Sequence, residues 1–128
     1  MLEANYQAVC CVMACLLQVH DLDEVLVEAL MAKGAKNGVS PAIMMQSCDI
    51  VITCLPNPAA SAAVVQAMLA HLKPGKIWLE MSTTDEAEVK RLGALAQAKG
   101  GQAVDCPVSG GCHRADTGNI SIFAGCDR

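Results

Sequence analysis

Near its middle the chain reads Asp49-Ile50-Val51-Ile52-Thr53-Cys54-Leu55, a nearly continuous apolar run of strand length. β-Branched residues dominate the run, and such a run is typical of a strand that is covered on both of its faces. Asn57-Pro58 follows it and supplies a helix N-cap and a first-turn proline. We therefore expect a buried strand that leads directly into a helix.

Short apolar segments and segments of helical periodicity alternate on both sides of this run. The pattern predicts strands at 16–20, 49–55, 76–81, 102–105 and 119–124, and helices at 23–33, 41–47, 58–73 and 83–99. Strands and helices that alternate in units of about thirty residues form right-handed βαβ crossovers. The sequence therefore predicts an α/β, Rossmann-like fold with a mostly parallel sheet and helices on both faces.

Composition excludes several classes of protein. The 128 residues are 53% hydrophobic and 17% charged, which is typical of an ordered domain with a real core. The net charge of −4 and the isolated aromatics Tyr6, Trp78 and Phe123 argue against nucleic-acid binding. The apolar stretch 8–17 is too short for a membrane span, which needs about 20 residues. We expect no nucleic-acid and no membrane partner.

The eight cysteines do not form a recognisable framework. Their density lies below the roughly 8–10% of a disulfide scaffold, and no C-x-x-C occurs. Cys112-His113 has no partners at metal-ligand spacing, so we predict no metal site. This usage favours a reducing compartment and hence a cytoplasmic protein.

Four polar or turn-forming segments follow the predicted strands, at the edge where an open parallel sheet binds its ligands. Asp21 could accept hydrogen bonds from an adenosine ribose, or it could serve the entry of the following helix together with Asp23. Leu55-Pro56 could line a cofactor, although capping of the next helix applies there as well. Ser82-Thr83 could approach a cofactor or belong to a capping box.

Ser109-Gly110-Gly111 is the fourth segment. A tight turn needs one glycine, and this loop has two, behind Pro107 and beside a hydroxyl. Glycines leave backbone N–H groups uncovered, and successive N–H groups can form a concave anion site. The loop is therefore a candidate cradle for a substrate carboxylate, whereas His113-Arg114 is interpreted as a solvated loop.

The strand-end acid, the Leu-Pro turn, Glu80-Met81-Ser82-Thr83 and Pro107-Val108-Ser109-Gly110-Gly111, with Gly118 downstream, resemble the signature of the β-hydroxyacid dehydrogenases. This is the family of 3-hydroxyisobutyrate and 6-phosphogluconate dehydrogenases. The resemblance implies hydride transfer between NAD or NADP and the hydroxyl of a small β-hydroxyacid, with a lysine as general acid/base.

The resemblance also assigns residues to roles. It implies that Ser109, Gly110 and Gly111 bind the substrate carboxylate, and that Leu55, Pro56 and Thr83 contact the cofactor. Asp21, as the ribose acid, is a further candidate cofactor residue and favours NAD over NADP.

Two family features have no counterpart in the sequence. The G-x-G-x-x-G turn should lie about 20 residues before Asp21, but no glycine precedes Gly34. The catalytic lysine of the family lies beyond the Rossmann domain, and no lysine here matches it, including Lys73, Lys76, Lys90 and Lys99. Ala60 also stands where the family often has asparagine.

These departures define the expected organisation and function. We predict an atypical apolar N-terminal segment at 1–17, whose part 8–17 could supply a surrogate strand, and a partial NAD(P)-binding domain with an incomplete first βα unit at 18–128. The favoured hypothesis is a partial dehydrogenase, inactive alone. The alternative is a non-catalytic, Rossmann-like module, a pseudoenzyme that binds a ligand or a protein. A homo-oligomer is compatible with both hypotheses.

Overall fold

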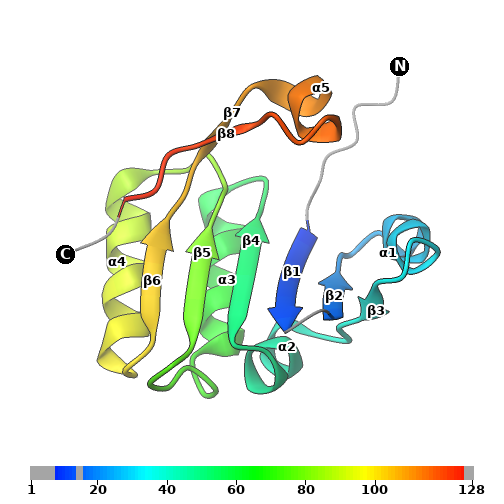
Figure 1. Ribbon diagram of the computed structural model, residues 1–128. Coiled ribbons are helices and arrows are strands. Elements are labelled where there is room, and N and C mark those ends of the chain that lie inside the picture. The colour runs from blue at the N-terminus through cyan, green and yellow to red at the C-terminus, as the bar shows by residue number, and fades with distance from the viewer. Residues whose placement is uncertain (1–7, 14–15, 126–128) are drawn as a thin grey trace.

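The computed structural model describes residues 8–13 and 16–125, and its main feature is a six-stranded sheet (Figure 1). The strand order is β3-β2-β1-β4-β5-β6, which is the order of a Rossmann fold. The strands of this sheet are β1 (Ala8–Met13), β2 (Leu16–His20), β3 (Lys36–Asn37), β4 (Ile50–Cys54), β5 (Ile77–Glu80) and β6 (Gln102–Asp105). The α/β, Rossmann-like prediction is confirmed.

Strand β1 occupies the central position of the sheet but runs in the opposite direction to its neighbours. It pairs antiparallel with β2, with Val9 opposite His20, and antiparallel with β4, with Val9 opposite Thr53. The other pairs in this sheet are parallel, so β2, β4, β5 and β6 all point the same way. The predicted surrogate strand is therefore confirmed over Ala8–Met13, in the place where a Rossmann fold has its first parallel strand.

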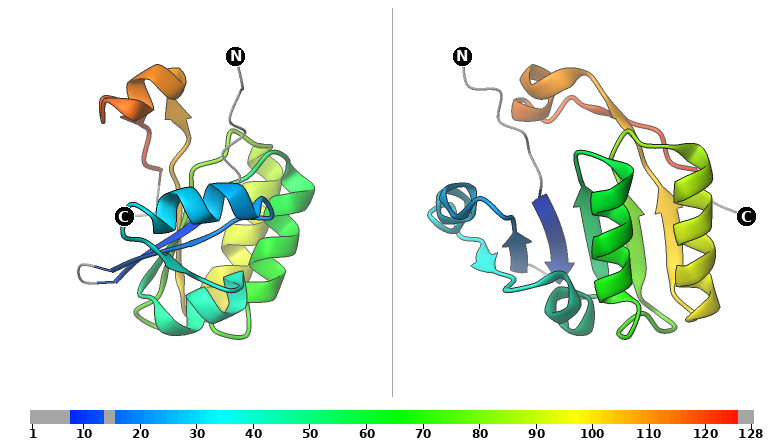
Figure 2. Two further views of the ribbon diagram at one scale, coloured as in Figure 1. Left: turned by 90° about the vertical axis from the view of Figure 1, so that its right-hand side faces the viewer. Right: turned by 180° about the vertical axis from the view of Figure 1, so that it is seen from behind.

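The helices begin where the sequence supplies caps. Asp23, Ser40, Asn57 and Asp85 each accept a hydrogen bond from a first-turn N–H. The helices that they start are α1 (Glu24–Met31), α2 (Pro41–Ser47), α3 (Pro58–Met68) and α4 (Glu86–Ala98). Figure 2 shows α3 and α4 side by side on one face of the sheet. No helix in the described ranges is long and apolar enough to span a membrane.

The C-terminal part of the chain forms a small separate unit above the sheet (Figure 1). Strand β7 (Val108–Ser109) pairs antiparallel with β8 (Ser121–Ile122), and α5 (Gly111–Asp116) lies between them. Helix α5 was not expected, because the two glycines at its start and the exposed His113-Arg114 indicated a loop. The predicted strand at 119–124 is shortened to β8, and Gly125 makes an isolated bridge to Asp105.

The core lies between the sheet and the helices α2, α3 and α4. Its buried side chains include Val51 and Trp78 of the sheet and Val65 of α3. Burial alternates along β4, since Val51 and Thr53 are buried whereas their neighbours are only half-buried. The expectation that the run 49–55 is covered on both faces is therefore wrong for the described part of the chain.

The second sheet face is covered only at one end. The registers of β1 with β2 and β4 put Val19 on the same face as Ile52, and Val19 lines a small cavity together with Val27 of α1. Helix α1 therefore lies on the face opposite α3 and α4, as predicted for helices on both faces. Over β4 to β6 no described helix covers this face. The side chains there are Ile50, Ile52, Ile77, Leu79 and Val104, all half-buried.

Adjacent residues of β4 offer a matched test of this asymmetry. Val51→Ala is expected to lower the free energy of unfolding by about 2–3 kcal/mol, because it leaves a cavity in the core. Ile52→Ala removes a larger side chain but is expected to cost only about 1 kcal/mol, because Ile52 remains partly in contact with water. Urea unfolding of both variants would measure the difference, and an equal or larger loss for Ile52→Ala would contradict the described packing.

Candidate functional site

The predicted site residues lie at one edge of the main sheet. Because β2, β4, β5 and β6 are parallel to one another, their carboxyl ends share this edge, which is the upper edge in Figure 1. Asp21 follows β2, Leu55-Pro56 follows β4, and Thr83 lies shortly after β5. The β7–α5–β8 unit, with Ser109, rises beyond the same edge. The fold thus brings all four predicted segments to one side of the molecule.

Asp21 serves the helix entry and still has one carboxylate oxygen without a partner. Its Oδ1 accepts the Asp23 N–H at 2.9 Å, while Asp23 itself caps α1. The Asp21 Oδ2 is buried and has no hydrogen-bond partner among the described residues. A cavity of about 500 Å³ lies beside His20 and Asp21. Helix entry uses only one oxygen, so an acceptor for a ligand hydroxyl remains.

The Leu55-Pro56 turn is held from the neighbouring strand. The Leu55 N–H donates to Ser82 Oγ at 2.6 Å, and Asn57 caps α3 by accepting the Ala60 N–H at 2.9 Å. Ser82-Thr83 do not cap α4, because the cap of this helix is Asp85, whose carboxylate accepts the Glu88 N–H at 3.0 Å. Ser82 is therefore a buried link between two strand ends, and the exposed Thr83 is not needed to cap α4.

The Ser109-Gly110-Gly111 loop is exposed and has a backbone that favours glycine at two successive positions. Gly110 has φ 130° and Gly111 has φ 68°. A Cβ at Gly110 would lie 2.8 Å from Arg114 Cδ, whereas a Cβ at Gly111 would meet nothing within 4 Å. No side chain caps the start of α5 at Gly110. Both glycines are thus explained by geometry, and the loop presents backbone beside the Ser109 hydroxyl.

Gly110→Ala is expected to be more disruptive than Gly111→Ala. Both substitutions place a side chain at positive φ, which costs about 1–2 kcal/mol. Only Gly110→Ala also forces Arg114 to move. Chemical shifts of β7 and α5 should therefore change over more residues in Gly110→Ala, while the main sheet stays unchanged. Equal perturbation by the two variants would contradict the observed loop.

None of the lysines named above lies with the Ser109 loop. Lys76 precedes β5 and is buried at the opposite edge, where its Nζ donates to Cys48 O at 2.6 Å. Lys90 forms an ion pair with Glu86 on α4, with Nζ and Oε1 2.6 Å apart. Lys73 and Lys99 lie beyond the C-terminal ends of α3 and α4. The structure therefore gives no reason to assign any of them a proton-transfer role.

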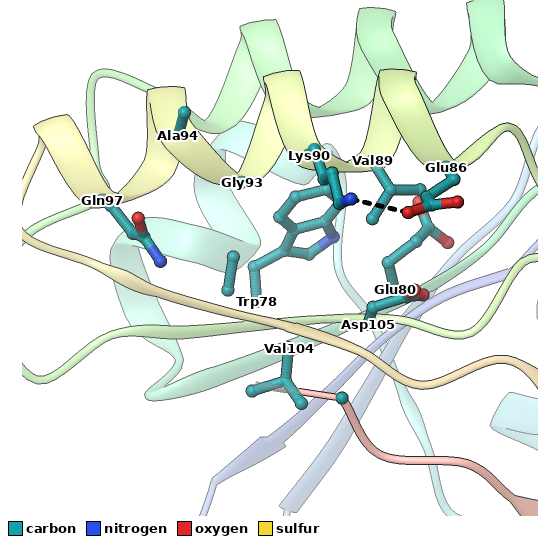
Figure 3. A pocket seen from close by; sticks show the side chains of 12 residues that line it. Trp78, Glu80, Glu86, Val89, Lys90, Gly93, Ala94, Gln97, Val104 and Asp105 are labelled. Carbon is teal, nitrogen blue, oxygen red and sulfur yellow. Dashed lines mark hydrogen bonds and ion pairs between the residues drawn. The ribbon is translucent and has the colours of Figure 1, made fainter. Parts of the chain in front are cut away.

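A groove of about 470 Å³ lies between α4 and the strands β5 and β6 (Figure 3). Lys90 reaches Glu86 at its upper rim in this view, and Glu80 and Asp105 lie nearby. Burial, and secondarily the negative charge of Glu86, raises the pKa of Asp105. None of the predicted cofactor or substrate residues lines this groove.

Glu80 is the residue at this edge whose importance the sequence did not reveal. It is 1% exposed, and its Oε1 accepts hydrogen bonds from the Ser82 N–H and the Ser82 hydroxyl. Burial, and secondarily the charge of Glu80, raises the pKa of the Cys54 thiol, which disfavours a thiolate there. The spacing Glu80-x-Ser82 is the only signal of this contact in the sequence, and it occurs within the segment that carried the family resemblance.

The residues at this sheet edge suit the ribose of a nicotinamide dinucleotide better than its pyrophosphate. The orphan Asp21 oxygen suits a ribose hydroxyl, and Leu55, Pro56 and Thr83 stand at neighbouring strand ends. No glycine precedes Gly34, so the sequence has no glycine-rich turn for the pyrophosphate. The described strand at the central position, β1, also runs opposite to the strand that would carry such a turn. The residues present therefore offer an acceptor suited to a ribose hydroxyl, but no glycine-rich turn for the pyrophosphate.

Known proteins match most of this chain. The model of a family described as the NAD binding domain of 6-phosphogluconate dehydrogenase matches residues 12–128. The NAD-dependent L-serine dehydrogenase of Pseudomonas aeruginosa is 34% identical over 115 residues, which are 88% of this chain and 39% of that protein. The cytokine-like nuclear factor N-PAC of Danio rerio is 33% identical over 99 residues, which are 75% of this chain and 21% of that protein.

A solved structure of a related enzyme matches the fold of this chain. The 3-hydroxyisobutyrate dehydrogenase of Mycobacterium tuberculosis, determined with L-serine, matches with a TM-score of 0.79 and 26% identity. The match covers 84% of this chain and 37% of that one. The chain thus spans well under half the length of the relatives that it matches.

Proposed function

Because this chain belongs to the family of the NAD-binding domain of 6-phosphogluconate dehydrogenase, we propose that it forms the cofactor side, and part of the substrate side, of a β-hydroxyacid dehydrogenase site. The partial domain at 18–128 carries this role. In a complete site, Asp21, Leu55, Pro56 and Thr83 contact the dinucleotide. Ser109, Gly110 and Gly111 hold the carboxylate of a small hydroxyacid.

The observation that carries the proposal is the convergence of four segments on one sheet edge. Two of them, at Leu55 and Ser82, are joined by a direct hydrogen bond of 2.6 Å. Ligands of open α/β sheets bind outside the carboxyl ends of the strands, which is where these segments lie. The bound nicotinamide supplies the hydride acceptor. The chain supplies positions for the cofactor and the acid, but no lysine for the proton.

Titration of the labelled chain with NAD, NADP and adenosine, followed by NMR, tests this proposal. We expect weak binding, with Kd at about the millimolar level, because the pyrophosphate has no glycine-rich turn. Adenosine should then bind nearly as well as NAD. We expect no hydride transfer, measured as nicotinamide absorbance with a β-hydroxyacid present. The absence of shifts at Asp21, Leu55 and Thr83 with all three ligands would refute the proposal.

Asp21→Asn separates the ribose role of Asp21 from its helix role. The variant keeps an oxygen for the Asp23 N–H and replaces the orphan Oδ2 by an amide. We expect the Kd for NAD to rise about tenfold, through loss of one charge-assisted hydrogen bond, and the preference for NAD over NADP to shrink. Asp23→Ala is the control, since it should lower the stability by about 1 kcal/mol without changing the Kd. The opposite pattern would make Asp21 a helix-entry residue only.

A second candidate function is a non-catalytic module that associates with itself or with another protein. The observation in its favour is that β2, α1 and their flanking loops expose several large apolar side chains, namely Leu16, Leu17, Leu22, Val25, Met31 and Val39. An interface that covered these side chains would remove apolar surface from water, which favours association. Sedimentation equilibrium distinguishes the two functions, because a stable homo-oligomer without dinucleotide binding favours the module.

We also propose a cytoplasmic location, on the cysteine usage of the sequence. The free thiols of Cys54 and Cys112 agree with a reducing compartment, whereas the disulfide of Cys48 in the structure is the observation that counts against it. Thiol titration of protein purified from its own cells under alkylating conditions tests this location. Fully reduced cysteines would support it, and a quantitatively oxidised Cys48 would argue against it.

A further inference from the structure

A buried carboxylate, that of Glu80, ends a hydrogen-bond chain that runs from the Leu55 N–H through the Ser82 hydroxyl. Glu80 is the last residue of β5, and its register partners are Thr53 of β4 and Asp105 of β6. It is 1% exposed. Burying a carboxylate is costly unless hydrogen bonds stabilise it, and an apolar residue would fill the same space without that cost. Packing alone therefore does not explain a carboxylate at this position, and its hydrogen bonds must be considered.

The Glu80 carboxylate determines in which direction the Ser82 hydroxyl donates its hydrogen bond. Glu80 Oε1 accepts the Ser82 N–H at 2.9 Å and also accepts the Ser82 hydroxyl proton. A hydroxyl has one proton to donate and lone pairs with which to accept. Because its proton points to Glu80, the Ser82 Oγ faces its other neighbour as an acceptor. That neighbour is the Leu55 N–H, at 2.6 Å.

The Leu55 N–H anchors the point at which the chain leaves β4. Pro56 follows and has no N–H, so it cannot contribute a donor to the turn. The next fixed contact is the cap of α3, where Asn57 accepts the Ala60 N–H. The nearby Thr53 hydroxyl already has another partner, because its Oγ1 accepts the Trp78 Nε1–H at 2.8 Å. Among the described residues, Ser82 thus makes the only cross-strand side-chain bond to Leu55.

We propose that Glu80 is a positioning residue that sets the Leu55-Pro56 turn by way of Ser82. The relevance to a cofactor rests on the function proposed above, since Leu55, Pro56 and Thr83 form its dinucleotide side. Glu80 touches no ligand itself. Its carboxylate orients one hydroxyl, that hydroxyl fixes one backbone N–H, and the turn then presents Leu55 and Pro56 in one conformation.

Amide hydrogen exchange in the full chain tests the proposal without any ligand. In Glu80→Leu, the exchange of the Leu55 and Ser82 amides should accelerate about tenfold beyond that of the core amide of Val51. The Ser82 amide loses its acceptor, and the Leu55 amide faces a Ser82 hydroxyl that is no longer oriented by a carboxylate. In Glu80→Gln, the side-chain oxygen can still accept both Ser82 donors, so protection should be restored. Leu72→Ala is the matched control, a core change beyond α3 that should accelerate all these amides equally.

Ser82→Ala keeps the proposal testable where Glu80→Leu does not fold. It removes the acceptor of Leu55 but leaves the Ser82 position its own N–H bond to Glu80. The amide of Leu55 alone should then lose protection. Unchanged protection of Leu55 in Glu80→Leu or Ser82→Ala would overturn the proposal, as would a failure of Glu80→Gln to restore it.

Dinucleotide titration of the same variants separates the two proposals. The Kd for NAD should rise about tenfold in Glu80→Leu, because the Leu55-Pro56 turn is no longer held in one conformation. The Kd should return to the parent value in Glu80→Gln. The exchange pattern alone decides the positioning role. If the exchange pattern holds while no variant binds dinucleotide, the proposed function fails and the positioning of the turn by Glu80 stands.

Discussion

Trp78→Ala is expected to lower the free energy of unfolding by about 3–5 kcal/mol, the range for removing a buried large aromatic side chain. Trp78 is 1% exposed and belongs to the cluster that joins β5 to α3 and α4. Its indole N–H also donates to Thr53 Oγ1 at 2.8 Å. Domains of this kind have total stabilities of about 5–15 kcal/mol. The variant should therefore be largely unfolded in mild denaturant that leaves the parent chain folded.

Far-UV circular dichroism in urea is the appropriate measurement, because Trp78 is the single tryptophan and its fluorescence disappears in the variant. Two further variants separate the contribution of the buried ring from that of the indole hydrogen bond. Trp78→Phe keeps a buried ring and should lose about 1–2 kcal/mol, while Thr53→Val removes only the hydroxyl partner and should lose about 1 kcal/mol. A loss below 1 kcal/mol for Trp78→Ala would mean that α4 does not pack on β5 as described.

The succession of strands and helices was predictable because local chemistry specifies it. Asp23, Ser40 and Asn57 stand where caps are required, and all three do cap helices. The direction of β1 was not predictable from residues 8–13, since an apolar run has the same pattern in both directions. Helix α5 was missed because Gly110 and Gly111, which permit its entry, have the composition of a loop.

The candidate site was predictable as a set of positions but not as a set of contacts. Strand ends follow from periodicity, so Asp21, Leu55 and Thr83 could be assigned to one edge. The link between Glu80, Ser82 and Leu55 depends on two strands lying side by side, a property of the tertiary fold. Coverage of a sheet face is likewise tertiary, and so the run 49–55 could not reveal that only one of its faces packs against helices.

The second large effect is expected at the opposite edge of the sheet, where Lys76→Ala should cost about 2–4 kcal/mol. The Lys76 Nζ donates to Cys48 O at 2.6 Å and to Gln46 O at 3.3 Å, so it caps the C-terminal carbonyls of α2. Lys76 is 7% exposed. Its removal leaves two carbonyls without their donor, at about 1–3 kcal/mol for a buried polar group, and opens a cavity.

Three matched variants identify which interaction carries this effect. Lys76→Met retains most of the aliphatic stem and should recover the packing but not the capping bonds. Asp49→Asn should change the stability by less than about 0.5 kcal/mol, because the Nζ–Oδ1 distance is 3.9 Å and the Asp49 side chain is 78% exposed. Lys73→Ala, an exposed neighbour, should be equally neutral. Stability losses measured by urea unfolding should be insensitive to salt. A strong salt dependence, or a large effect of Asp49→Asn, would show that Lys76 acts as an ion pair and not as the cap of α2.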